Sequence, residues 1–465
     1  MEWLIASWQR SEGRLFHHAF VFEFEGKMNP GKVRSAWNTL AQHHHILRST
    51  FVPSHVKGST SYYPVIVSYK HQDPEWLEQS LEANAADELS ALKQLLSNAM
   101  ISLPSIAKVP TRLTYVHGTL QDYFIINLHH FAYDAWSLRL IMNDFRMILN
   151  DQSPQFGNNL SGFLFRSEQS ETRSEIQRRY WQGLFRNRVS GKLFPHLNRP
   201  SCDESSNDNG QIMLRCFVFE DVIHSLESKE RRAQELGLPL HLLLLASWGI
   251  VQQRYSTSRN AETADGDVVF GLWHSGRLEE SEPPSGLDIP NLAVPTVNIL
   301  PVRVEYHKDS ENLVAAAAKN LRLQLQQRSS VIEQSRWVDV VRWIAETQDA
   351  SHPRLCNVFV NLLKPPHRLE HPLSYSFPSS GSYVSFKAIK FPYSPSSRVK
   401  IESSLLRPRY DITEVVQPDL LVDIFLNPAN DTIGISFECE HTLVGEDHAK
   451  DFVADWATML DSALR

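Results

Sequence analysis

Features that would reveal a function at once are scarce in this chain of 465 residues. The GxSxG, GxGxxG and Walker A patterns are absent, which argues against serine hydrolase and nucleotide chemistry. The formal net charge of −7 gives no basic field that would attract nucleic acid or anionic lipid. The 4 cysteines, none in a CxxC pair, indicate reduced thiols rather than a disulfide framework or zinc site: Cys202, Cys216, Cys356 and Cys439.

Long apolar runs are also scarce. The most apolar one, LPLHLLLLASWGIVQQ (residues 238–253), is shorter and more interrupted than the roughly 20 residues that span a membrane, and it predicts a buried helix. The opening MEWLIASW has no basic leader, so no signal peptide is expected. We therefore expect a cytoplasmic protein whose ligand is a small molecule or another protein.

The length suggests two or three domain-sized units, and strands and helices occur in both halves. AFVFEFEG (residues 19–26) alternates as a half-buried strand does, and LLVDIFLN with TIGISFECE (residues 420–440) reads as a hairpin. The stretch 187–210 is polar, turn-rich and aperiodic. We therefore predict a mixed α/β fold with an N-terminal lobe over 1–186, a linker over 187–210 and a C-terminal lobe over 211–465.

One segment combines chemistry with a clear local structure. QDYFIINLHH (residues 121–130) is apolar on both faces, as in a central strand, and apolar spacing predicts a helix that begins near Asp134. Aspartate is a favoured N-cap, so Asp134 has a purely structural interpretation. His129 and His130 point to opposite faces of the strand. His130 ends an apolar row, so it is either a core residue or a residue that faces a cavity.

A metal site is not indicated by the histidines. His129 and His130 diverge, and no third ligand lies at a recognisable spacing. The run His43 to His45 does not indicate a metal site either, because consecutive helical residues point about 100° apart. We expect these three histidines on the surface.

This segment and five others in the chain together resemble the motifs of one family. HHFAYDAWS resembles the HHxxxDG core motif of the condensation domains of nonribosomal peptide synthetases, within the chloramphenicol-acetyltransferase-like superfamily, and its form is similar to fungal members. Five more segments resemble family elements, in the family's order: MEWLIASW (1–8), HHHILRSTF (43–51), RRYWQGLF (178–185), VVFGLWHSGR (268–277) and VPTVNILPVRV (294–304). Three positions depart from the motifs: Ala135 replaces a glycine, and His43 and His45 replace an arginine and a glutamate.

The resemblance implies two chloramphenicol-acetyltransferase-like lobes arranged as a V around a central tunnel. Phosphopantetheine arms of donor and acceptor carrier proteins would enter it, and an amide bond would form between a donor acyl or peptidyl thioester and an acceptor aminoacyl thioester. The domain would bind no metal or cofactor of its own and would be part of a larger multidomain synthetase. His130 would lie at the tunnel centre, either as a general base or as the residue that positions the amine.

The resemblance also implies supporting roles. Asp134 would be structural and would pair with Arg48, while His129 would hold the loop by hydrogen bonding. Backbone N–H groups at the helix start would stabilise the oxyanion: those of Ala135 and Trp136. Three residues would line the tunnel or be structural: Ser275, Arg277 and Asn298. The side chains of Trp136, Phe131 and Trp248 are expected in the core.

Three alternatives stay open. A terminal domain of this type releases its product by cyclisation or ester formation, although the retained His129 favours bond formation between two substrates. An epimerase would need a glutamate motif in the second half that is not found. A non-catalytic carrier-docking module is the third, and the retained His130, Asp134 and Arg48 argue against it.

Overall fold

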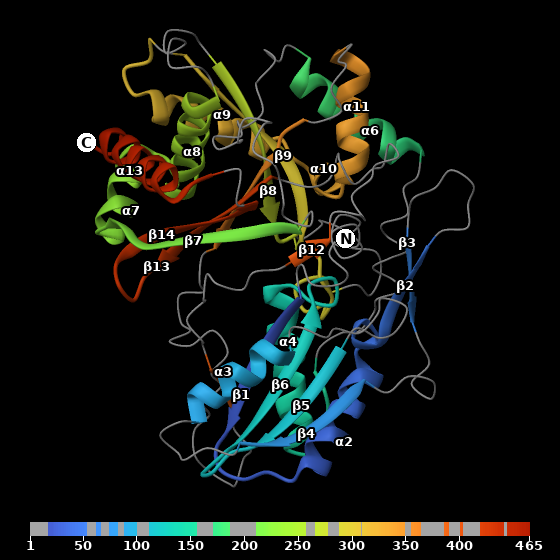
Figure 1. Cartoon of the computed structure of the whole chain (residues 1–465). Coiled ribbons are helices and arrows are strands. Elements are labelled where there is room, and N and C mark those ends of the chain that lie inside the picture. The colour runs from blue at the N-terminus through green and yellow to red at the C-terminus, as the bar shows by residue number, and fades with distance from the viewer. Residues whose placement is uncertain are drawn as a thin grey trace. The chain divides into compact units, whose positions relative to one another are not determined.

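The computed structural model of the chain describes residues 17–53, 62–66, 74–81, 88–99, 111–155, 171–186, 211–256, 266–277, 288–307, 309–348, 355–363, 386–389, 400–402, 419–440 and 444–465 (Figure 1). The opening motif and the predicted linker lie outside these residues. Packing divides the chain into two compact units: unit 1 holds residues 1–168, 277–296 and 368–393, and unit 2 holds 169–276, 297–367 and 394–465.

This division corrects the predicted lobe boundaries. Helix α6 (Glu171–Phe185), expected at the end of the N-terminal lobe, belongs to unit 2. Two segments expected in the C-terminal lobe, residues 277–296 and 368–393, belong to unit 1. The linker was predicted from the polar composition of residues 187–210, which is a local property of the sequence. It carries no information on which distant segments pack together.

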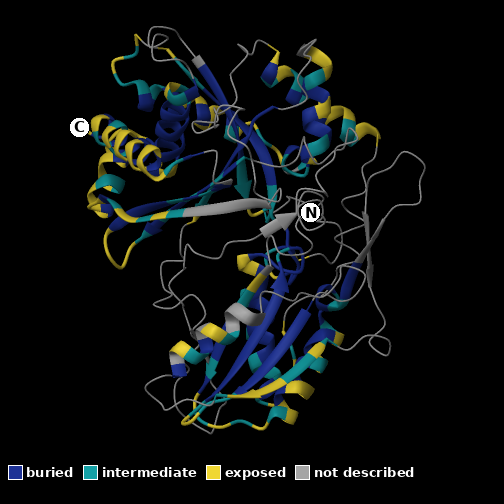
Figure 2. Cartoon of the chain, viewed as in Figure 1, coloured by how far each residue is buried: buried dark blue, intermediate teal, exposed yellow. Residues whose placement is uncertain are grey.

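Unit 1 is built on a sheet of β1 (His17–Phe24), β4 (Glu75–Ser80), β5 (Thr111–His117), β6 (Asp122–His129) and β11 (Phe386–Ile389). The strand order is β11-β1-β6-β5-β4, and β6 pairs antiparallel with both β1 and β5. Every residue of β6 is buried, and all but the last residue of its neighbour β5 are buried too (Figure 2). The prediction of a central strand covered on both sides is confirmed.

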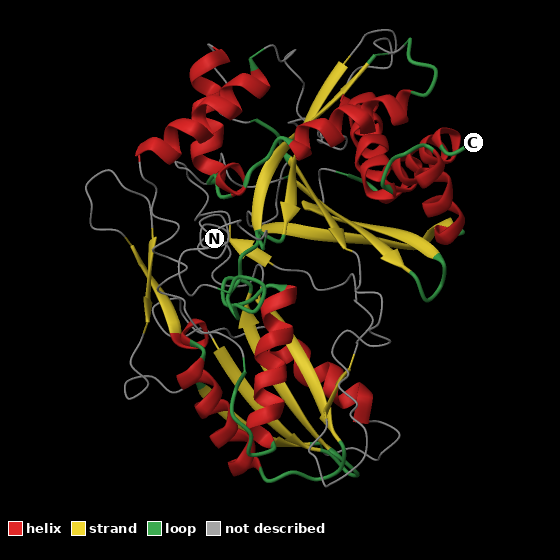
Figure 3. Cartoon of the chain, turned by 180° about the vertical axis from the view of Figure 1, so that it is seen from behind, coloured by secondary structure: helices red, strands yellow, loops and turns green. Residues whose placement is uncertain are grey.

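Helices cover both faces of this sheet. Helices α2 (Pro30–His43) and α4 (Ala135–Leu149) pack against one another, and Trp37 of α2 meets Phe124 and Phe145 at ring-centroid distances of 6.0 and 5.8 Å (Figure 3). On the other face, Leu92 of α3 (Glu88–Ala99) packs with Ile125. Phe124 and Ile125 point to opposite faces because side chains alternate along a strand. The short helix η1 (His45–Arg48) then leads into a hairpin of β2 (Ser49–Pro53) and β3 (Tyr62–Ile66).

Unit 2 contains a larger sheet, with the strands β7 (Gln211–His224), β8 (Gly266–His274), β9 (Asn298–Tyr306), β10 (Val358–Leu363), β12 (Lys400–Glu402), β13 (Leu420–Asn427) and β14 (Thr432–Glu440). Its order is β12-β7-β14-β13-β10-β8-β9. β13 and β14 form the predicted antiparallel hairpin. β9 begins at Asn298, so residues 294–297, the first part of the motif VPTVNILPVRV, precede this strand.

Helix α8 is the core of unit 2. The helices here are α7 (Leu226–Glu235), α8 (Leu240–Ser256), α9 (Leu313–Gln326), α10 (Ser330–Glu333), α11 (Trp337–Gln348) and α13 (Glu446–Ala463). Trp248 in α8 is 0% exposed, and a Cβ on Gly249 would lie 2.9 Å from Val304, so only glycine lets the helix approach β9 this closely. The buried helix is therefore confirmed. Helices α6, α10 and α11 pack together, and the Trp181 indole donates to Ser335 Oγ at 2.9 Å.

No single helix among the described residues passes a length and hydropathy test for crossing a membrane. The pair α7 and α8, bent by 94°, passes it jointly.

Candidate active site

The candidate site is the connection from β6 to α4 in unit 1. β6 ends at His129, a turn follows, and Asp134 is the N-cap of α4. Ser137 N donates to Asp134 Oδ1 at 2.6 Å, and Asp134 N donates to Ser137 Oγ at 2.8 Å. This reciprocal pair is a capping box, which fixes the start of the helix. The predicted helix start and the N-cap at Asp134 are confirmed.

The cation that pairs with Asp134 is Arg277. Its Nη2 lies 3.3 Å from Oδ1 and 3.4 Å from Oδ2 of Asp134, and both side chains are buried. Thr296 N also donates to Oδ2, at 2.8 Å. The expected pairing with Arg48 is therefore wrong: Arg48 Nε donates to the carbonyl of Ala41 at 3.1 Å.

Arg277 also organises the segment that carries Thr296. Nη1 donates to the carbonyls of Ile289 and Leu292, each at 2.9 Å, and Nη2 donates to the carbonyl of Val294 at 2.8 Å. Burial lowers the pKa of Arg277, and the Asp134 carboxylate opposes that shift. One guanidinium thus anchors residues 288–296 onto the cap of α4. This explains why the segment before β9 is not strand.

His130 lies in the turn, half-buried, beside this cap. Burial lowers its pKa below the ordinary value of 6.5, and the charge of Asp134 opposes the shift only in part. Burial therefore makes this imidazole harder to protonate than a free histidine side chain. Its ring stacks on Tyr133, with centroids 4.9 Å apart and an interplanar angle of 18°.

His129 has the opposite environment. It is 0% exposed, and its Nδ1 accepts a hydrogen bond from Phe131 N at 3.2 Å. This bond stabilises the turn that carries His130. The two adjacent histidines thus differ in burial and in contacts.

The first residues of α4 face solvent. Ala135 and Trp136 are exposed, and their backbone N–H groups belong to the first turn, where no intrahelical acceptor exists. The Trp136 indole donates to the carbonyl of Pro290 at 2.8 Å and lies 4.4 Å from the Arg139 guanidinium. Trp136 is 43% exposed, so its predicted core position is wrong, whereas Phe131 and Trp248 are core residues as predicted.

The remaining candidates lie in unit 2. Ser275 is exposed in the turn after β8, next to Gly276, whose φ of +62° favours glycine. Asn298 Nδ2 donates to the carbonyls of Glu333 and Ser335, at 2.8 and 3.0 Å, and so connects β9 to α10. Of the three tunnel candidates, only Arg277 joins the His130–Asp134 turn within one unit.

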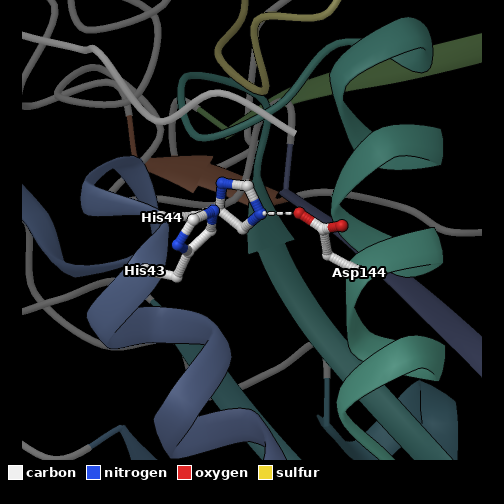
Figure 4. Close-up of side chains that lie close together, drawn as sticks. All are labelled: His43, His44 and Asp144. Atoms are coloured by element: carbon white, nitrogen blue, oxygen red, sulfur yellow. Dashed lines mark hydrogen bonds and ion pairs between the residues drawn. The ribbon is translucent and has the colours of Figure 1, made fainter. Parts of the chain in front are cut away.

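A second histidine–aspartate pair was missed by the sequence interpretation. Ligand atoms of His43, His44 and Asp144 all lie within 4.8 Å of one another (Figure 4). His44 Nε2 donates to Asp144 Oδ2 at 2.8 Å, and Asp144 Oδ1 accepts from Gln155 N at 2.8 Å. His44 is 1% exposed, so its predicted surface position is wrong.

We interpret this cluster as structural. Both carboxylate oxygens of Asp144 already accept protein hydrogen bonds, and a metal ion would have to displace the His44 donor. Burial lowers the pKa of His44, while Asp144 opposes the shift. The pair joins the C-terminal end of α2 to the middle of α4. No local signal in the sequence connects two residues so far apart in the chain.

Known proteins are similar to this chain in sequence and in fold. The sequence profile described as "Condensation domain" matches residues 3–357. Coprinoferrin synthetase of Coprinopsis cinerea is 29% identical over 473 residues, which cover 100% of this chain and 18% of that protein. A ferrichrome siderophore peptide synthetase of Mycosarcoma maydis is 27% identical over 397 residues, which cover 82% of this chain and 8% of that protein. The condensation domain of the monacolin K polyketide synthase MokA superposes with a TM-score of 0.67 at 12% identity, covering 99% of this chain and 96% of that one.

The chain belongs to the condensation domain family. The resemblance stated from its motifs is therefore confirmed, as is the mixed α/β fold of the chloramphenicol-acetyltransferase type. Condensation domains of nonribosomal peptide synthetases are acyltransferases that form amide bonds, and this chain is an enzyme domain of that class. The chain spans less than a fifth of the length of coprinoferrin synthetase.

Proposed function

We propose that this domain joins a donor acyl or peptidyl thioester to the amine of an acceptor aminoacyl thioester, both held on phosphopantetheine arms of carrier proteins, with His130 at the reaction centre. The observation that carries the proposal is a half-buried imidazole four positions before an aspartate whose position is fixed by a capping box and a buried arginine. Such an imidazole is suited to accept or guide the proton of an attacking amine.

The proposed reaction begins when the acceptor amine attacks the donor thioester carbonyl. His130 accepts the proton that the nitrogen loses, the C–S bond breaks, and the proton passes to the departing thiolate. Backbone N–H groups of Ala135 and Trp136 supply donors at the positive end of the α4 dipole, where an oxyanion would be stabilised. General-base catalysis contributes about 10²–10⁴-fold. Proximity contributes about 7–11 kcal/mol, so holding the two arms in place is the larger effect.

In this proposal Asp134 and Arg277 are structural. Asp134 Oδ1 caps α4 and Oδ2 receives Thr296 N, so both oxygens are occupied by protein donors. The ion pair keeps the turn that carries His130 in one conformation. Ser275 and Asn298 stay proposed as structural or tunnel-lining residues, and the V-shaped arrangement of lobes around a tunnel stays a prediction.

The relatives suggest a substrate class. One of them is named a ferrichrome siderophore peptide synthetase. We propose that the domain works within a larger, cytoplasmic synthetase that assembles a siderophore peptide, with donor and acceptor carrier domains as its partners. It would need no metal or cofactor of its own.

The direct test uses donor and acceptor carrier proteins loaded with acyl groups, and mass spectrometry of the acceptor arm. We expect a longer, carrier-bound chain that contains a new amide. His130→Ala should lower the rate of product formation by about 10²–10⁴-fold. His224→Ala, at an exposed position at the end of β7, is the control and should change nothing. Release of a free cyclic or ester product would favour the terminal-domain alternative. Carrier binding without turnover would favour a docking module.

A further inference from the structure

Two side chains next to His130 have no place in the HHxxxDG motif. Tyr133 occupies the last of its three open positions, directly before Asp134, and is 4% exposed. His18 belongs to β1, the neighbour of β6 in the sheet, and is paired in register with Leu128. Both residues belong to unit 1, as His130 does.

The three rings form one compact cluster. The Tyr133 ring lies nearly parallel to the His130 imidazole, with centroids 4.9 Å apart. His18 meets both rings edge-on, 5.8 Å from His130 and 6.0 Å from Tyr133. Phe20, also on β1, meets Tyr133 edge-on at 5.1 Å. Tyr133 is thus confined between β1 on one side and the imidazole on the other.

A hydrogen bond fixes the tyrosine from its far end. The Tyr133 hydroxyl contacts His18 Nδ1. Burial raises the pKa of Tyr133 well above 10, so the hydroxyl keeps its proton and is able to donate a hydrogen bond to the His18 nitrogen. His18 is exposed but is anchored through the backbone pairing of β1 with β6. The sheet therefore fixes Tyr133 independently of the turn to which it belongs.

We propose that Tyr133 and His18 are positioning residues for His130, with the Tyr133 ring as the wall that sets the imidazole plane and His18 as the anchor of that wall. This inference rests on the proposed role of His130 in amide formation. The terminal torsion of histidine is broad, so packing rather than an intrinsic preference must select the ring orientation. A wall on one face restricts the imidazole to the orientation in which one nitrogen meets the incoming amine. The same ring also excludes water from that face of the imidazole.

Variants separate the wall from its anchor. Tyr133→Leu removes the wall, and kcat should fall about 100-fold, the loss that a misplacement of about 1 Å causes. His18→Leu removes only the anchor, and kcat should fall about tenfold. His18→Asn places an acceptor oxygen near the position of Nδ1 and should restore kcat to within about threefold of wild type. KM for the carriers should stay constant in all three variants.

The His130 pKa supplies a readout that simple destabilisation would not move. Without the wall the imidazole gains water, so its pKa should rise toward the ordinary value of about 6.5. Nuclear magnetic resonance of the imidazole signals gives this pKa in the free domain. The matched control is Tyr115→Phe, which removes a buried hydroxyl whose bonds to Met28 and Asp122 lie at the opposite end of the same sheet. It should lower stability without changing kcat or the His130 pKa.

The inference is overturned if Tyr133→Leu and His18→Leu both fold and behave like wild type. That outcome means a kcat within about twofold of wild type and a His130 pKa within about 0.2 units of it, on the order of measurement error. It is also overturned if His18→Asn is as impaired as His18→Leu. Failure of the proposed function looks different: the wild-type domain then gives no amide product at all. In that case the resonance measurement alone decides whether Tyr133 and His18 set the environment of His130.

Discussion

Helix α4 carries two histidine–aspartate neighbourhoods that differ in every contact that matters. At its N-cap, Asp134 binds Arg277, Thr296 and Ser137, and His130 stands beside this set, half-buried. Ten residues further on, Asp144 binds His44 directly, and both side chains are 0% exposed. At the N-cap the carboxylate is bound by an arginine and by backbone donors, and the structure gives it no direct hydrogen bond to the histidine among the contacts described above. Where it binds the histidine itself, the pair only joins two helices.

Among the substitutions that test this comparison, the largest effect on stability is expected at Arg277. Arg277→Ala leaves the Asp134 carboxylate buried without its cation, which should lower the free energy of unfolding by about 3–5 kcal/mol. Urea denaturation followed by circular dichroism measures this change. The double variant Arg277→Met with Asp134→Asn removes both charges and should recover most of the loss. If Arg277→Ala alone were neutral, the ion pair would not hold the turn.

His44→Ala should lower stability and leave activity unchanged, which is the opposite of what we expect for His130→Ala. It leaves Asp144 without one of its buried donors, at a cost of about 1–3 kcal/mol in the free energy of unfolding. Activity per folded molecule should remain, because His44 is remote from the proposed chemistry. His130→Ala should do the reverse, with unfolding by urea almost unchanged and product formation lost. A loss of kcat in folded His44→Ala would contradict the structural role.

The pH dependence of stability should be smaller and should have a defined sign. Burial lowers the pKa of His44, so the unfolded chain binds the proton first. Its contribution is fully present above about pH 6.5 and is lost as the pH falls toward the lower folded-state pKa. His44→Gln should flatten the decrease of unfolding free energy below pH 6.5. The slope should not vanish, because burial in unit 2 lowers the pKa of His274 to about 4 with the same sign.

The smallest effect is expected at Trp136. Trp136→Phe keeps an aromatic ring but removes the indole bond to Pro290, which is worth about 0.5–1.5 kcal/mol. A small shift of the thermal midpoint with unchanged kcat should result. Trp136→Gly would confound this measurement through helix propensity and is not a suitable comparison. A large loss of kcat in Trp136→Phe would instead place the indole among the groups that contact substrate.

Local patterns predicted the elements that carry the site. The alternation and burial of β6, the helix from Ala135 and its cap at Asp134 all follow from residue spacing, because strand and helix periods are properties of the backbone. The mostly apolar α8 could be assigned to a core from its composition. The motif order further identified the family and therefore the fold.

The errors share a physical cause. Arg48 was assigned to Asp134 by analogy with the family, whereas the structure brings in Arg277 from 143 positions away. His44 was expected on the surface, yet it meets Asp144 from 100 positions away. Charge pairing across such separations depends on which segments pack together, and residue spacing does not contain that information.

The sequence by itself determined the family, the helices and strands around residues 121–149, and the identity of the histidine pair. Only the tertiary structure decided which cation binds Asp134, which histidine is buried against a carboxylate, and that Tyr133 and His18 enclose His130. Backbone periodicity acts over neighbouring residues, and one chain therefore suffices to read it. These ion pairs and ring contacts form between residues that become neighbours only once the sheet of unit 1 and the segments around it have packed together.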